Sequence, residues 1–117
     1  MHVRELLHVN VEVSDLPRAL AFYRQLGFAE IARAGTPERD GAWLRFDDGR
    51  ELHLSVGPAK SPSRSHFAVL VDDVAAARSV CAKLGAAIEA ARDQPGLLRF
   101  FVRDPDGNRI EIAQRLD

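Results

Sequence analysis

The sequence contains a single cysteine, Cys81, so no disulfide can form within the chain. Long apolar runs are also missing, because charged residues interrupt every run before the roughly 20 residues that a membrane span needs. The N-terminus lacks the basic and then apolar segments of a secretory signal. These absences predict a cytoplasmic protein without a membrane partner. The pattern of residues places Cys81 toward the helix layer, which predicts a small core residue rather than a nucleophile.

The chain also lacks an excess of charge of either sign. Sixteen Lys and Arg residues against seventeen Asp and Glu residues give a net charge of -1. This balance excludes the basic surface that is typical of proteins that bind nucleic acid. No Gly-rich phosphate loop and no Ser/His/Asp spacing of a known hydrolase stands out. At 117 residues the composition indicates one globular domain, and the expected partner is a small-molecule substrate.

What the chain does contain is an internal repeat. A shift of 58 residues, without a gap, pairs residues 6–32 with residues 64–90 and continues through the rest of each half. The identities fall on strand valines, on aspartates before helices, on glycines after helices and on Asp-Gly turns. His8 falls on His66. The repeat therefore predicts that one structural module has been duplicated.

We predict one domain of two repeats, about 5–56 and 64–115, joined by the Pro/Ser-rich linker 57–63. In each copy, apolar residues first alternate with polar ones as in a half-buried strand, and then recur with the helical period. Ser14 or Asp15 can cap the first helix, and Asp73 the second. Three short strands follow each helix, and Asp-Gly turns join the last two. They are expected near 29–33, 42–46, 51–56, 87–91, 98–103 and 109–114. The predicted fold class is α+β, with two tandem βαβββ modules.

Four potential metal ligands occupy equivalent positions in the two copies. His8 and His66 lie on the polar faces of the first strands, and His53 and Glu111 lie on the polar faces of the fourth strands. If the two copies curl into facing sheets, all four side chains converge. Imidazole and carboxylate ligands suit Zn, Ni, Co, Fe and Mn, whereas calcium requires more oxygen ligands.

Other features carry less functional information. His2 lies at a terminus that is expected to fray, and we assign it no role. The DPDGN segment (104–108) is interpreted as a hairpin turn rather than a site. Trp43 and Phe101 are repeat equivalents, and either a pocket wall or a core position is consistent with their pattern.

Four segments together resemble the vicinal-oxygen-chelate superfamily: HVNVEVSDLPRALAFYRQLGF, RELHLSV, HFAVLVDDV and FFVRDPDGNRIEI. This superfamily groups glyoxalase I, fosfomycin-resistance enzymes, extradiol dioxygenases, methylmalonyl-CoA epimerase and bleomycin-resistance proteins. The resemblance covers nearly the whole chain. It implies that the two modules form a cupped mixed sheet around a divalent metal, with the helices on its outer face, in a homodimer.

The resemblance also suggests roles for the four residues. His8, His66 and Glu111 match metal ligands that several enzymes of the superfamily share, whereas His53 stands where glyoxalase I typically has a glutamate. Three histidines and one carboxylate around a dication leave a formal charge of +1, which favours an anionic oxygen ligand. His53 is then a fourth metal ligand or an acid/base, and Glu111 can leave the metal to shuttle a proton.

The leading hypothesis from the resemblance is a metal-dependent enzyme of the glyoxalase/dioxygenase type, with lyase or isomerase chemistry through a metal-chelated oxyanion. An extradiol-type dioxygenase is the enzymatic alternative, because two histidines and one carboxylate also form the facial triad of non-haem Fe(II) oxygenases. A metal-free protein that sequesters a drug, like the bleomycin-resistance proteins, is the alternative from another class. The intact set of ligands favours an enzyme.

Overall fold

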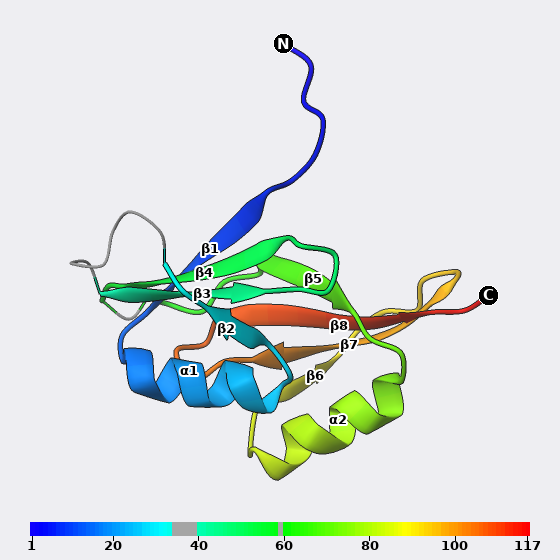
Figure 1. The fold of residues 1–117 in the computed structure, drawn as a ribbon. Coiled ribbons are helices and arrows are strands. Elements are labelled where there is room, and N and C mark those ends of the chain that lie inside the picture. Colours follow the sequence, from blue (N-terminus) through cyan, green and yellow to red (C-terminus); the bar gives the residue numbers. More distant parts are fainter. Residues whose placement is uncertain (34–39, 59) are drawn as a thin grey trace. The chain divides into compact units, whose positions relative to one another are not determined.

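We describe the fold from a computed structural model, for residues 1–33, 40–58 and 60–117 (Figure 1). The chain divides into two compact units, Met1–Ala59 and Lys60–Asp117. Each unit contains one copy of the predicted repeat. Position 59 of the predicted linker lies outside the described residues.

The first unit has the predicted βαβββ order. Its elements are β1 (His8–Val13), α1 (Leu16–Gln25), β2 (Ala29–Ile31), β3 (Gly41–Arg45) and β4 (Glu51–Val56). The strands form one mixed sheet in the order β1-β4-β3-β2, in which β1 is parallel to β4 and the other pairs are antiparallel. α1 packs against β3 and β4 on one face of this sheet (Figure 1).

The second unit repeats this arrangement. Its elements are β5 (His66–Leu70), α2 (Val74–Lys83), β6 (Ile88–Ala90), β7 (Leu97–Arg103) and β8 (Arg109–Arg115). The sheet order is β5-β8-β7-β6, and α2 packs against β7 and β8. The α+β class and the two βαβββ modules are therefore confirmed. Among the described residues, no helix is long and apolar enough to span a membrane.

Both helices begin and end with the residues that the repeat predicts. Asp15 caps α1 and Asp73 caps α2, and each carboxylate accepts a hydrogen bond at 3.0 Å from the backbone N–H three residues later. Gly27 and Gly85 follow the two helices with φ angles of +103° and +70°, which other residues adopt only with strain. These signals fix where each helix starts and stops.

The core of each unit lies between its helix and its sheet. Cys81 on α2 is fully buried, as predicted for a core residue, and burial raises the pKa of its thiol. The main buried apolar residues of the strands are Val11, Val13, Ala42, Leu44, Leu52, Leu54, Phe100, Val102, Ile110 and Ile112. Leu7 would continue the apolar alternation of β1 toward the N-terminus, but β1 begins one residue later and Leu7 is 71% exposed.

The DPDGN segment is a hairpin turn between β7 and β8, as predicted. Asp104 is buried, and its carboxylate accepts hydrogen bonds from the backbone N–H groups of Asp106 and Asn108, both at 2.9 Å. The backbone N–H of Asp104 donates to the carbonyl of Asn108 at 2.9 Å. The carboxylate of Asp104 therefore helps to close the turn.

Candidate metal and substrate site

In the first unit, three aromatic rings stack on the face of the sheet that points away from α1. Leu52 and Leu54 are buried, so His53 between them projects from the opposite face. The His8 ring stacks on the His53 ring with centroids 4.0 Å apart, and the Trp43 ring also stacks on the His53 ring, with centroids 4.4 Å apart. Because β4 lies between β1 and β3, His53 is the middle ring. These contacts hold its imidazole plane in one orientation.

The His53 ring is also held by a carboxylate. Its Nε2 donates a hydrogen bond to Oε1 of Glu51 at 2.9 Å, and Nη2 of Arg45 donates to Oε2 of the same group at 3.0 Å. The His53 hydrogen bond and the Arg45 ion pair lower the pKa of the Glu51 carboxyl. An ionised carboxylate only accepts hydrogen bonds, so Nε2 carries the proton and Nδ1 keeps the lone pair of the neutral ring.

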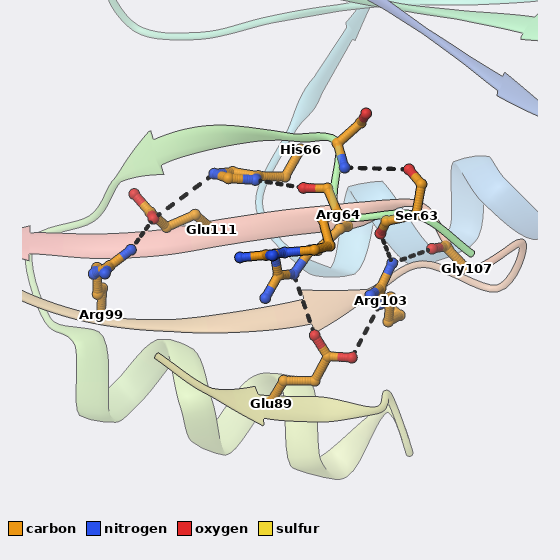
Figure 2. Close-up of polar contacts among 10 residues, drawn as sticks. Ser63, Arg64, His66, Glu89, Arg99, Arg103, Gly107 and Glu111 are labelled. Atoms are coloured by element: carbon orange, nitrogen blue, oxygen red, sulfur yellow. Dashed lines mark hydrogen bonds and ion pairs between the residues drawn. The ribbon is translucent and has the colours of Figure 1, made fainter. Parts of the chain in front are cut away.

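In the second unit, His66 and Glu111 face each other. Nδ1 of His66 donates a hydrogen bond to the backbone carbonyl of Arg64 at 3.0 Å, which leaves the lone pair on Nε2 (Figure 2). That atom lies 3.9 Å from Oε1 of Glu111. Histidines that bind metals in proteins are commonly oriented in this way, by a carbonyl on the second ring nitrogen.

An arginine that no sequence motif marks also holds Glu111. Nη1 of Arg99 donates to Oε1 of Glu111 at 2.5 Å, and Nη2 donates to the carbonyl of Arg92 at 3.0 Å. Arg99 alternates with Phe101 and Arg103 along β7, and Phe101 pairs with Glu111 in the sheet. The two-residue period was therefore a signal that could have placed Arg99 on the same face as Glu111.

Phe101 and a second ion-pair network complete this face. The Phe101 ring contacts the His66 ring edge to face at 5.1 Å, and the Arg109 guanidinium lies 3.5 Å above its centroid. Arg103 and Arg109 both donate to Glu89, at 3.1 and 3.2 Å. The hydrogen bond from Arg103, together with Arg109, lowers the pKa of Glu89. Phe101 and its repeat equivalent Trp43 thus each contact a predicted ligand histidine.

The structure brings the predicted ligands together in pairs, His8 with His53 in one unit and His66 with Glu111 in the other. Among the described residues, no group of three or more His, Cys, Asp or Glu side chains is arranged to hold one metal ion. Two ligands in a tetrahedral shell lie roughly 3.3–3.6 Å apart when each bond is about 2.0–2.2 Å long. The 3.9 Å separation of His66 and Glu111 is therefore compatible with a shared cation after a small shift. The four-ligand site stays a prediction.

Known proteins resemble the chain over nearly its full length. A family model described as the Glyoxalase/Bleomycin resistance protein/Dioxygenase superfamily matches residues 5–112. A lactoylglutathione lyase from Haemophilus influenzae is 32% identical over 124 residues, which cover 94% of the chain and 92% of that protein. A protein of Arabidopsis thaliana named "Probable lactoylglutathione lyase, chloroplastic" is 29% identical over 129 residues, and the match covers 96% of the chain but 36% of the plant protein.

Solved structures show the same fold. A glyoxalase/dioxygenase from Nostoc punctiforme superimposes with a TM-score of 0.82 at 25% sequence identity. The superposition covers 97% of the chain and 92% of that protein. The duplicated βαβββ arrangement therefore has a close structural counterpart.

Proposed function

The chain belongs to the Glyoxalase/Bleomycin resistance protein/Dioxygenase superfamily, and from this premise we propose that it is a metal-dependent enzyme with a small-molecule substrate. The proposed chemistry is that of a glyoxalase-type lyase or isomerase, in which a proton moves next to a substrate oxyanion. A bound Zn, Ni, Co, Fe or Mn ion would supply Lewis-acid polarisation of adjacent substrate oxygens.

The orientation of His66 is the observation that carries this proposal. Its Nδ1–H is donated to the Arg64 carbonyl, and its Nε2 lone pair lies 3.9 Å from a Glu111 carboxylate oxygen. A histidine used only for packing does not need a fixed tautomer beside a carboxylate. The donor types, imidazole nitrogen and carboxylate oxygen, are those that the proposed dications prefer.

We assign metal binding to His8, His66 and Glu111, and the fourth ligand position or an acid/base role to His53. The Glu51 carboxylate on Nε2 of His53 favours the acid/base role, because a carboxylate partner orients an imidazole and fixes which nitrogen carries the proton. Glu111 is the second candidate for moving a proton, since a carboxylate can leave a metal while histidines keep it bound.

The substitution His53→Glu tests this assignment. It supplies a second carboxylate at the position that the repeat equates with Glu111, and the added negative charge lowers the formal charge of the proposed site from +1 to 0. We expect the variant to retain the metal and to isomerise the hemithioacetal of methylglyoxal and a thiol faster than the wild type, because two carboxylates then share ligation and proton transfer. His66→Ala is the control, and it should lose metal and activity together.

Two outcomes would contradict the assignment. If His53→Glu removes the metal as completely as His66→Ala, position 53 requires a neutral ligand and is not equivalent to a carboxylate. If the wild type instead takes up oxygen with a catechol after anaerobic loading with Fe(II), and isomerises no hemithioacetal, the extradiol-type dioxygenase replaces the lyase.

A further inference from the structure

Arg99 holds Glu111 by an ion pair on the face of the second sheet that points away from α2. The strand register pairs Arg99 with Ala113 and Phe101 with Glu111, so the guanidinium reaches the carboxylate along the diagonal. Nη1 is 2.5 Å from Oε1 of Glu111, and Nη2 donates to the Arg92 carbonyl. Nε is buried and has no hydrogen-bond partner in the part of the chain that the structure describes. Glu111 is thus the anion that balances this guanidinium.

The oxygen that Arg99 holds is also the oxygen that faces His66. Oε1 of Glu111 lies 2.5 Å from Nη1 of Arg99 and 3.9 Å from Nε2 of His66 (Figure 2). A dication held between His66 and this oxygen would draw on the same atom that now accepts from Arg99, and its charge would repel the guanidinium. Cation binding and the Arg99–Glu111 ion pair therefore compete.

Loss of this ion pair would leave a positive charge with little access to water. The Arg99 side chain is 17% exposed, and a poorly hydrated charge without a counter-ion is unfavourable. Arg103 and Arg109 on the same face already share the single carboxylate of Glu89. A negatively charged group that bound beside the metal would therefore restore the balance of charge.

We propose that Arg99 is an anion-binding residue that metal binding unmasks, and that it recognises a carboxylate, phosphate or phosphonate group of the substrate. The inference rests on the proposed function, because the unmasking requires a metal at Glu111. A guanidinium presents its N–H donors in a planar fork that matches two oxygens of such a group. The register places Ala68 beside Glu111 and Ala113 beside Arg99, so these neighbouring strand positions carry no bulky side chain.

Titration calorimetry with inorganic phosphate tests the inference on metal-free and Mn²⁺-loaded protein. The loaded wild type should bind phosphate about tenfold more tightly than the metal-free wild type. The loaded Arg99→Met variant should bind phosphate about tenfold more weakly than the loaded wild type, because the fork is missing. In phosphate-free buffer, Arg99→Met should bind Mn²⁺ more tightly than the wild type, because Glu111 is no longer held by a competing cation.

Two further variants make the test specific. Arg78→Met removes the same charge from α2, where the guanidinium lies over Phe100, and it should leave both affinities unchanged. Arg99→Lys keeps the positive charge, so Mn²⁺ should still tighten phosphate binding in this variant, whereas Arg99→Met should lose most of this effect. The lysine variant also gives a second measure of the effect of Mn²⁺ on phosphate binding if circular dichroism shows that Arg99→Met is not folded.

The possible results separate the inference from the proposed function. If Mn²⁺ tightens phosphate binding equally in the wild type, Arg99→Met and Arg99→Lys, the inference is wrong, although the protein can still be a metal-dependent enzyme. Loss of Mn²⁺ binding in Arg99→Met as large as in Glu111→Gln would also overturn it, because Arg99 would then only position Glu111. A folded wild type that takes up no metal would contradict the proposed function itself.

Discussion

At the scale of single residues, Glu89 forms ion pairs that link its own strand to two others. It lies on β6 and accepts hydrogen bonds from Arg103 on β7 and Arg109 on β8. Its pKa is lowered from the ordinary value of 4.5, chiefly by Arg103. A carboxyl whose pKa is lower in the folded state stabilises the fold above the unfolded-state pKa, and this contribution is lost as the pH falls through the folded-state pKa.

We therefore predict that Glu89→Gln lowers the free energy of unfolding at pH 7 and has a smaller effect at pH 3, because the stabilisation by the wild-type carboxylate is lost as the pH falls through its lowered pKa. Urea unfolding followed by circular dichroism at both pH values measures the difference. Glu5→Gln, in the exposed segment before β1, is the matched control and should change neither value. An equal loss of stability at both pH values for Glu89→Gln would show that the ion pairs are not its cause.

Alternation along the strands predicted the correct face for His53 and Glu111, because buried residues on both sides leave only one direction for the side chain. The partners of these residues were not predicted. Glu51 and Arg99 also lie on polar faces, but the period identifies a face and not which long side chain bends toward which neighbour. Such contacts depend on side-chain rotamers and on cross-strand register, and neither can be predicted from a single sequence.

At the scale of elements, the N-cap aspartates are the most specific local signals. Asp73 accepts a hydrogen bond from the backbone N–H of Ala76, one of the donors that the first turn of α2 leaves without a helical partner. Asp15 makes the equivalent bond in α1. The conservation of this contact between the two units explains why both helices start at corresponding residues.

Replacement of the cap gives a quantitative prediction. Asp73→Ala should lower the free energy of unfolding by about 1 kcal/mol, since one backbone donor loses its partner. The neighbouring exposed Asp72 provides the control, because Asp72→Ala removes the same charge without removing the cap. Equal losses for the two variants in urea unfolding would mean that charge near the helix N-terminus, rather than the capping hydrogen bond, accounts for the effect.

Element boundaries were predicted to within about two residues wherever a turn or cap residue marks them, as at the Asp-Gly hairpins. Leu7 lies at a boundary that no turn or cap residue marks. Its apolar side chain continues the alternation of β1, yet the parallel pairing with β4 begins with His8 and Glu51, so nothing in the sheet covers Leu7. The period of a strand does not show where its partner strand ends.

At the scale of the whole molecule, duplication has preserved the fold while changing the charges on equivalent positions. Glu51 and Arg109 occupy the same position of the repeat, as do His53 and Glu111. The first unit therefore presents aromatic rings with a carboxylate that holds an imidazole, and the second presents arginines with a carboxylate beside an imidazole. The two units thus carry different chemical groups at corresponding strand positions.

Metal analysis of the untagged chain by mass spectrometry distinguishes the proposed enzyme from a metal-free binding protein. We predict about one divalent metal ion per chain after purification or reconstitution, because a set of four nitrogen and oxygen donors binds such ions tightly. His66→Ala should lose this metal, whereas His2→Ala at the N-terminus should retain it. Folded wild-type protein that contains no metal, and takes up none when Zn, Ni, Co, Fe or Mn is supplied, would contradict the proposal.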